Sequence, residues 1–454
     1  MSQKPLLTRF DYRTKFRRGF FMYNFDVAII GGGLSGLTAA NFLARVGKKV
    51  VVLEKSNRLG GRAMTNDKNG VLMNLGAHGL YLEGKAMKIL TELGITLPGE
   101  NASKSVQIQG IWKNAVYTIP TDFSSILSSS LLSWKAKIVF SKLMLKLMKG
   151  NINSNPDVSL SDWAEAEISD PMVRHIFYSL CRLTTYISAP TVQQAKPVLK
   201  QMKRALDGGV LYVDGGWETI IQKLKKQAVE AGVEMIYCKN VIEIEHHEQS
   251  QSIRCSDGEL YTVSDCIITA PPKEALNMIN VPNYTSLSTW TEQAIPVTAC
   301  CLDLGMKKLP NPHNQFALGL DQSLFFTNQS RAAKLSEDGT IVVSLVKYHN
   351  PIDPSINQLA DKDQLEAAMD LLHPDWRKEV VEQQFLPKIT VVHDFPHLKR
   401  SGNPGPAIPQ MKGIYIAGDW CGHEEVLADA AVASGKRAAL QIVKTNELIL
   451  VKEG

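Results

Sequence analysis

Apolar residues follow two kinds of pattern along this chain of 454 residues. Near the start, apolar runs at 26–30 and 48–53 enclose a segment with helical spacing at 37–46, which predicts a buried strand, a helix and a second buried strand. Further on, residues 340–347 and 385–392 alternate apolar and polar positions, a pattern typical of strands. The patterns therefore predict an α/β unit and a second region that contains strands.

The length of the chain indicates more than one domain, because a single core rarely grows past about 250–300 residues. Hydrophobic residues make up 44% of the chain and charged residues 21%, which excludes a mainly disordered protein. Two domains are expected, and a cofactor can lie between them.

A glycine-rich turn joins the first strand to the helix. Residues 31–36 read GGGLSG, which is the spacing G-x-G-x-x-G. Gly31 is expected to make the tight turn, Gly33 to let the backbone approach a pyrophosphate, and Gly36 to let the helix pack closely on the strand. This motif predicts a dinucleotide site, with a purely structural glycine turn as the alternative.

The residues around this turn supply the remaining expected contacts of the dinucleotide. The positive end of the helix, at Leu34 and Ser35, is expected to face the phosphates. Glu54 ends the second strand, where its carboxylate can accept hydrogen bonds from ribose hydroxyls, and Lys55 beside it is a further predicted contact.

A second glycine pair indicates which dinucleotide is bound. Gly60, Gly61 and Arg62 follow at once, and they would add backbone N–H groups and a guanidinium beside the same pyrophosphate. A nicotinamide dehydrogenase has no need of this second loop. The motif therefore favours FAD.

The run from 26 to 65 resembles the flavin-containing amine oxidase superfamily, which includes amine oxidases, protoporphyrinogen oxidase and phytoene desaturases. Three later segments extend the resemblance: Leu75-Gly76-Ala77-His78, the strand around Val241 after Gly215-Gly216, and the strand at 265–271. The resemblance implies that Gly76 and Ala77 pass the flavin ring and that the Val241 backbone holds the adenine.

The end of the chain carries the family's closing motif. A strand at 413–417 ends in Gly418 and Asp419, and a helix of small residues follows at 427–439. The resemblance implies that Asp419 holds the ribityl chain. It also implies that the helix N-terminus, at Leu427 and Ala428, faces the N1/C2=O edge of the flavin.

The resemblance also implies the fold, a discontinuous Rossmann-like FAD-binding domain with a mixed α+β substrate domain. The FAD-binding domain is expected at 22–95, 215–280 and 395–450. The substrate domain is expected at 96–214, where we predict helices, and at 281–394.

The expected activity is removal of hydride from an apolar substrate by non-covalent FAD, as in the desaturase and protoporphyrinogen oxidase branches. Amine oxidases of the family usually place a tyrosine before the acidic residue of the closing helix, whereas Leu427 and Ala428 precede Asp429 here. An amine or amino acid substrate is the alternative, with Trp420 or a tyrosine of the substrate domain as a different cage. A flavin-binding protein without turnover is the second alternative.

No catalytic residue is assigned, because flavin chemistry requires no compulsory acid or base from the protein. His78 could act on a proton, although a histidine bonded to backbone is the commoner case. Glu424 and Glu425, beside His423, are expected either at the cavity entrance or in a solvated turn. The electron acceptor, whether oxygen, a quinone or another carrier, is left open.

The charge distribution excludes a nucleic-acid function. The net charge of +5 comes entirely from residues 1–21, and the rest of the chain balances. Residues 1–21 are expected to be a disordered extension before a start at Met22, with a basic lipid-binding arm as the alternative. The seven cysteines lack the paired spacing of a zinc or redox site, so no metal and a cytoplasmic location are expected.

A helix predicted over 124–149 carries lysines on one face and Leu131, Ile138, Leu145 and Met148 on an apolar face. We expect the apolar face to pack on its own domain, with peripheral membrane contact as the alternative. No apolar run reaches the roughly 18–20 residues of a membrane-spanning helix.

Overall fold

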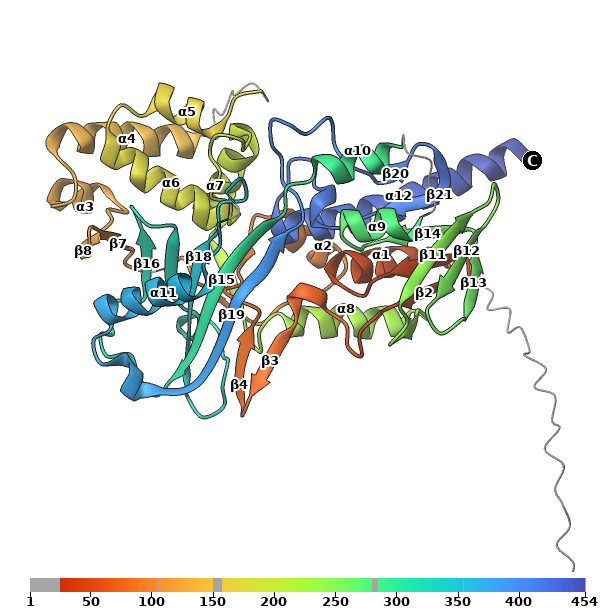
Figure 1. The fold of residues 1–454 in the computed structure, drawn as a ribbon, viewed down its shortest axis with the longest axis horizontal. Coiled ribbons are helices and arrows are strands. Elements are labelled where there is room, and N and C mark those ends of the chain that lie inside the picture. The colour runs from red at the N-terminus through yellow and green to blue at the C-terminus, as the bar shows by residue number, and fades with distance from the viewer. Residues whose placement is uncertain (1–24, 105, 150–156, 280–284, 354, 454) are drawn as a thin grey trace, which may run out of the picture.

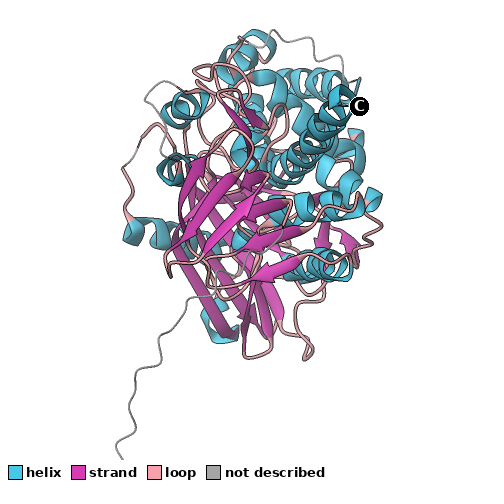
Figure 2. Ribbon diagram, turned by 90° about the vertical axis from the view of Figure 1, so that its right-hand side faces the viewer, coloured by secondary structure: helices cyan, strands magenta, loops and turns pink. Residues whose placement is uncertain are grey.

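The computed structural model describes residues 25–104, 106–149, 157–279, 285–353 and 355–453. The expected extension at 1–21 lies outside these residues. Figure 1 shows the chain as two layered regions: a six-stranded sheet with its helices at one end, and a seven-stranded sheet with a helical cap at the other. Figure 2 shows the strands grouped together, with most helices gathered above them.

The six-stranded sheet has the order β10-β2-β1-β14-β21-β20. Its strands come from three distant parts of the chain: β1 (Val27–Ile30), β2 (Val50–Leu53), β10 (Glu234–Ile236), β14 (Asp265–Ile268), β20 (Ala407–Ile408) and β21 (Met411–Ile416). All neighbours pair in parallel except β20 and β21. This confirms the predicted Rossmann-like α/β fold; the exact domain boundaries stay a prediction.

The apolar runs of this sheet are continuous because both of its faces are covered. Val27 and Ile29 contact α1 (Leu34–Arg45) and α12 (Leu427–Glu453) on one face. Ala28 and Ile30 point to the other face, toward the three-stranded sheet β11-β12-β13. Successive side chains of a strand alternate between faces, so a strand covered on both sides needs an unbroken apolar run. The bounds of that second sheet are β11 (Val241–His246), β12 (Gln251–Cys255) and β13 (Leu260–Val263).

The seven-stranded sheet has the order β19-β15-β18-β17-β16-β7-β8. Its strands are β7 (Gln109–Trp112), β8 (Ala115–Thr118), β15 (Val297–Met306), β16 (Phe316–Gly319), β17 (Leu324–Asn328), β18 (Ile341–Tyr348) and β19 (Val380–Val392). Both predicted strands of the second insert are present, in β18 and β19. The alternation at 340–347 does not give an exposed face, because the polar Ser344 is itself buried.

Both faces of this second sheet are covered by helices. Cys301 and Phe325 face a helical layer, whereas Cys300 and Phe326 face α11 (Gln358–Leu372). The adjacent cysteines therefore lie on opposite faces of β15, packed in two cores. The helical layer consists of α3 (Phe123–Ser128), α4 (Trp134–Lys149), α5 (Leu160–Glu167), α6 (Pro171–Thr185) and α7 (Ala195–Gly208).

The prediction that residues 96–214 are all helical is wrong at several places. Strands β7 and β8 pair as a hairpin through Lys113 and Asn114, both at positive φ, and extend the seven-stranded sheet. A Lys-Asn turn lacks the glycine that usually marks such a hairpin, so the turn signal is weak. Two further strands, β6 (Gly99–Asn101) and β9 (Val210–Val213), pair beside β5 (Leu80–Tyr81).

The single helix predicted over 124–149 is two helices, because α3 ends at Ser128 and α4 begins at Trp134. Serine hydroxyls in between accept backbone hydrogen bonds: Ser129 from Leu131 N–H and Ser133 from Ala136 N–H. Such local bonds compete with the helical ones and favour a break.

The remaining elements connect these layers. They are β3 (Thr65–Lys68), β4 (Val71–Asn74), α2 (Lys85–Glu92), α8 (Glu218–Glu230), α9 (Pro272–Met278), α10 (Ser286–Gln293) and the 3-10 turns η1 (Gly61–Ala63), η2 (Gln329–Arg331), η3 (Trp376–Glu379) and η4 (Asp419–Cys421). No helix within the described ranges is long and apolar enough to cross a membrane. The cytoplasmic location stays a prediction.

A buried polar network joins the two regions. Asp303 on β15 accepts hydrogen bonds from the Ser344 hydroxyl and from Gln384 Nε2, the latter at 2.9 Å. The same Gln384 amide donates to the Asn74 carbonyl at 2.7 Å, at the end of β4. Burial raises the pKa of Asp303 to about 6, although hydrogen bonds from Ser344, Gln384 and the Gly76 backbone act in the opposite direction.

This raised pKa makes stability depend on pH. The folded state binds the Asp303 proton more tightly than the unfolded state, so the contribution of Asp303 is most favourable below about pH 4 and is lost as the pH rises toward 6. The loss amounts to about 3 kcal/mol. The asparagine of Asp303→Asn does not titrate. The unfolding free energy of the wild type, measured relative to this variant, should therefore fall between pH 4 and 6 and stay constant above pH 6.

Denaturant unfolding of both proteins between pH 4 and 7 measures this difference. The hydrogen bonds that asparagine alters give an offset independent of pH, so the slope alone tests the assignment. A difference that is flat between pH 4 and 6 contradicts it.

Candidate active site

A cavity of about 570 Å³ lies at the carboxyl ends of β1, β2 and β14, where Ile30, Leu53 and Thr269 line it. In a parallel α/β sheet, ligands bind at this edge. The seven-stranded sheet closes the other side through Cys301 on β15 and Ile389 on β19. The cavity therefore lies between the two regions of the fold.

Most of the predicted cofactor contacts meet in this cavity. Of the seventeen residues, sixteen line it: Gly31, Gly33, Leu34, Ser35, Glu54, Lys55, Gly60, Gly61, Arg62, Gly76, Ala77, Val241, Gly418, Asp419, Leu427 and Ala428. Gly36 is the exception. A Cβ at Gly36 would lie 2.0 Å from the Gly31 carbonyl oxygen, so its role is the close packing of α1 on β1.

The two glycine loops face each other across the cavity. Gly60 N–H donates to the Gly32 carbonyl at 2.9 Å, and this contact holds the loops side by side. A Cβ at Gly33 would have no neighbour closer than 3.9 Å, so a side chain there would project into open space. The first turn of α1 has no side-chain cap, which leaves its N–H groups available to an anion.

One end of the cavity, the Glu54 end, is formed by Glu54, Lys239, Asn240 and Val241. The buried Glu54 carboxylate accepts hydrogen bonds from Gly32 N–H at 2.8 Å and from Ser56 N–H at 2.9 Å. These bonds fix the carboxylate at the strand end and leave lone pairs for a ligand. The Lys55 ammonium pairs at 3.2 Å with the carboxylate of Glu274, which also lines the cavity.

The opposite end, the Gly76 end, is formed by Gly76, Ala77, Tyr186, Cys301 and Ile389. A Cβ at Gly76 would lie 2.9 Å from Cys301 Sγ and 3.2 Å from Ile389 Cδ1, so the loop presses against the seven-stranded sheet. The Tyr186 hydroxyl donates to the Ala77 carbonyl at 2.7 Å. Burial raises the pKa values of Tyr186 and Cys301, which keeps both groups neutral.

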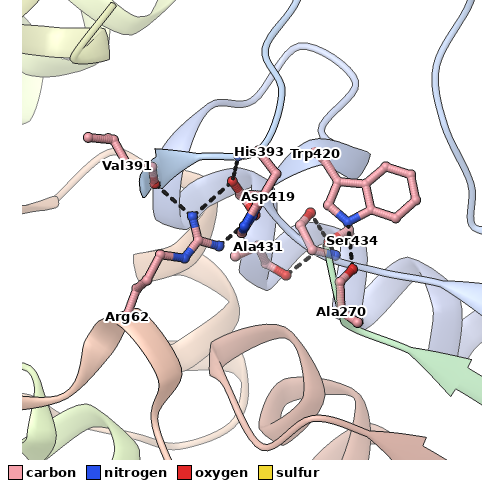
Figure 3. A network of polar contacts seen from close by, with 9 residues as sticks. Arg62, Ala270, Val391, His393, Asp419, Trp420, Ala431 and Ser434 are labelled. Carbon is pink, nitrogen blue, oxygen red and sulfur yellow. Dashed lines mark hydrogen bonds and ion pairs between the residues drawn. The ribbon is translucent and has the colours of Figure 1, made fainter. Parts of the chain in front are cut away.

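Between the ends, Arg62 and Asp419 form an ion pair that links the second glycine loop to the closing strand (Figure 3). Arg62 donates to both carboxylate oxygens, at 2.6 and 3.1 Å, and to the Val391 carbonyl at 2.7 Å. His393 N–H adds a bond of 2.6 Å to the same carboxylate. Burial acts to raise the pKa of Asp419, but Arg62 and His393 hold it well below its usual range.

His393 is a cavity residue that the sequence analysis missed. It lines the cavity directly after β19, far in sequence from Asp419 and Arg62. No local motif marks it, because its position follows only from the way the end of β19 approaches Asp419 beside the six-stranded sheet. Other cavity residues that were missed include Tyr81, Tyr186, Trp217, Lys239, Cys301 and Ile389.

His78 lies in the cavity lining with its Nδ1 atom 2.8 Å from the Gly76 carbonyl oxygen. Its ring stands edge-on to Trp217, with centroids 4.6 Å apart. Burial lowers the pKa of His78, so the neutral form is favoured. These contacts give His78 a structural role in holding the Gly76 loop.

The start of α12 also reaches the cavity. Leu427 adopts a left-handed conformation, with φ of 57°, which is uncommon for a residue other than glycine. Asp429 accepts a hydrogen bond of 2.8 Å from Ala86 N–H at the start of α2, while its second oxygen has no partner among the described residues. Burial raises the pKa of Asp429. Asp429, in the first turn of α12, thus caps the N-terminus of α2.

The acidic residues before this helix lie outside the cavity. Glu424 pairs with Lys200 at 2.5 Å and with Lys196 at 3.6 Å, which ties the segment to α7. Glu425 is buried and pairs with Arg437 at 3.1 Å. Neither residue lines the cavity. Glu424 is exposed in a bend, as the predicted solvated turn requires, whereas the solvated turn is wrong for the buried Glu425. Trp420 is also packed away, with its Nε1–H donating to the Ala270 carbonyl.

This arrangement fits FAD. An adenosine matches the Glu54 end, a pyrophosphate matches the uncapped helix start between the two glycine loops, and a flat ring matches the Gly76 end. Among the described residues no cluster of histidine, cysteine and carboxylate groups could hold a metal ion.

Comparison with known proteins gives the family and the relatives. The family model described as flavin containing amine oxidoreductase matches residues 34–443. A 15-cis-phytoene desaturase of Solanum lycopersicum is 23% identical, over 94% of this chain and 79% of that protein. Polyamine oxidase 4 of Oryza sativa subsp. japonica is 25% identical, over 54% of this chain and 51% of that protein.

A solved structure shares the fold. The crystal structure of an oxidoreductase from Methanosarcina mazei superimposes with a TM-score of 0.73 at 18% sequence identity, over 92% of this chain and 100% of that chain. The resemblance covers both regions of the fold.

Replacing Arg62 by glutamine should weaken flavin retention. The change leaves the buried Asp419 carboxylate without its cation, and one charge-assisted hydrogen bond contributes about 1.5–3 kcal/mol, so the flavin should bind at least roughly tenfold more weakly. Arg58→Gln is the matched control, because Arg58 bonds to Met64 and Thr65 outside the cavity. Flavin absorbance per polypeptide measures both, and an Arg62→Gln protein with full flavin content contradicts the role.

Gly33→Val and Gly36→Val should fail in different ways. Valine at 33 projects into the cavity, so the protein should fold normally and bind little flavin. Valine at 36 clashes with the Gly31 carbonyl, so the apoprotein itself should lose roughly 1–3 kcal/mol of unfolding free energy or more. Thermal unfolding of the apoproteins and their flavin titration separate the effects; equal stability of both variants overturns this assignment.

Proposed function

The chain belongs to the flavin-containing amine oxidoreductase family and is a flavin-dependent oxidoreductase, and we propose that it removes hydride from an apolar substrate with FAD bound non-covalently. The observation that carries this proposal is the composition of the Gly76 end. Its side chains are Ala77, Tyr186, Cys301 and Ile389, all of them uncharged. A hydrocarbon or other lipophilic group can lie against such a surface without leaving a charge unpaired.

The hydrogen bonds of the two cavity tyrosines support the same substrate class. The Tyr186 hydroxyl donates to the Ala77 carbonyl, and the Tyr81 hydroxyl donates to the Thr184 carbonyl at 3.1 Å. Both hydroxyls are therefore engaged with backbone and present mainly ring surface to the cavity. FAD supplies the hydride acceptor, and these residues position the substrate and exclude water.

Oxidation of an amine is the second candidate, and a specific observation favours it. Asp429 lines the cavity with one carboxyl oxygen that has no partner among the described residues, and Tyr81 and Tyr186 supply aromatic rings in the same cavity. A carboxylate and aromatic rings together attract a cationic amine. Against this, burial raises the pKa of Asp429, which works against the charged form that a cation needs, and its other oxygen is held by α2.

Anaerobic titration of the flavin spectrum distinguishes the two candidates. Polyenes and porphyrinogens form one series, and amines and amino acids form the other, each added to the purified yellow protein without oxygen. We expect bleaching by the lipophilic series alone, because only an apolar molecule matches the Gly76 end.

A variant strengthens this test. Ile389→Asp places a charge at the Gly76 end and should abolish bleaching by a lipophilic substrate, whereas Leu359→Asp, at an exposed position on α11, is the control. Bleaching by an amine in the wild type, with loss of the response in Asp429→Asn, would support the amine oxidase alternative instead.

A further inference from the structure

The outer face of α4 is apolar and uncovered. Trp134, Ile138, Leu145 and Met148 are exposed by 70%, 58%, 57% and 61%. The expectation that this apolar face packs on its own domain is therefore wrong for Ile138, Leu145 and Met148. Different residues of α4 make the packing contacts: Ala136, Phe140, Leu143 and Leu147.

Helical geometry places the two apolar sets on opposite sides. At about 100° per residue, the four exposed residues fall within an arc of roughly 80°, and the centre of the buried set lies nearly opposite. We call the exposed set, Trp134, Ile138, Leu145 and Met148, the α4 stripe. It is the outermost part of the helix, so each of its side chains can reach a flat surface together with the others.

Lysines surround the α4 stripe. Five lysines and no acidic residue lie between 123 and 149. Lys135, Lys142 and Lys149 form no ion pair with any described residue, and they lie along one edge of the stripe. Lys137 lies on the other edge, with its ammonium 4.7 Å from the centroid of the Trp134 ring.

The position of α4 leaves the stripe accessible. Figure 1 shows α4 with α3 at the outer end of the molecule, away from the six-stranded sheet and α12. The inner face of α4 belongs to the same apolar cluster as Ala77 of the Gly76 end. One short helix thus has an outer surface toward solvent and an inner surface continuous with the active-site region.

We propose that the α4 stripe docks on the surface of an anionic phospholipid bilayer. Tryptophan and long apolar side chains enter the interface between headgroups and acyl chains, while flanking lysines bind lipid phosphates. A second copy of the chain fits the surface less well. A twofold contact through the stripe would place unpaired lysines of both copies near one another, and α4 carries no acidic residue to pair with them.

Vesicle flotation tests the apolar part of the proposal. The full-length holoenzyme should float with vesicles of phosphatidylcholine and phosphatidylglycerol, and bind phosphatidylcholine alone far more weakly. Ile138→Ser with Leu145→Ser should reduce binding about tenfold or more. Both positions are exposed, so the fold and flavin content should remain. Leu359→Ser is the matched control, since Leu359 is 77% exposed on α11, outside α4.

A charge variant tests the lysines. Each lysine near an anionic surface contributes about 1 kcal/mol, so Lys135→Gln with Lys142→Gln should weaken binding to anionic vesicles roughly thirtyfold. Lys223→Gln with Lys226→Gln on α8 is the matched control. Raising the salt concentration should weaken the binding of the wild type to anionic vesicles, and it should weaken the binding of the Lys135/Lys142 variant less.

Three outcomes overturn the proposal: no flotation of the wild type, equal flotation of the wild type and the Ile138/Leu145 variant, or a dimer in sedimentation velocity that this variant dissolves. The last result assigns the stripe to a second copy of the chain. Flavin absorbance and flotation are measured independently, so a wrong substrate assignment leaves this test unchanged.

Discussion

The buried carboxylate of Asp419 sets a constraint that much of the active site satisfies. A charge taken out of water is stable only when a partner and hydrogen bonds replace its hydration, and Asp419 obtains these from Arg62 and His393. The three residues come from the second glycine loop, the end of β19 and the end of the closing strand. Together with the buried network around Asp303, this carboxylate therefore fixes where the two regions of the fold meet, and it places the cavity at that junction.

Local motifs in the sequence predicted the part of the site that local backbone geometry determines. Gly31, Gly33 and Gly60 stand in turns whose spacing has a steric reason, and the structure brings them to one cavity. His393 and Cys301 could not be found in this way. Their places depend on the pairing of β15 with β19 and on the approach of the end of β19 to Asp419, which no short stretch of sequence encodes.

The predictions of secondary structure in the substrate region failed for similar physical reasons. The hairpin of β7 and β8 turns on Lys113 and Asn114 without glycine, and serines around Ser129 and Ser133 divide one apparent helix into two. The helical period of α4 also gave two apolar stripes, and period alone does not say which one the domain buries. The helices and strands of the substrate region were accordingly the elements that the sequence predicted least well.

The order of the strands in the six-stranded sheet has a consequence for synthesis of the protein. Val27 pairs with Asp265, and Cys266 pairs with Ile414. The first strand therefore cannot complete its pairing before the middle of the chain is made, and the sheet is complete only after the end of the chain is made. Such distant pairings make folding slow. While the ribosome is still adding the last residues, β14 lacks its neighbour β21, and the face of β1 that carries Val27 and Ile29 lacks the cover of α12. Apolar surface of the nascent sheet is therefore open to aggregation until the end of the chain is made.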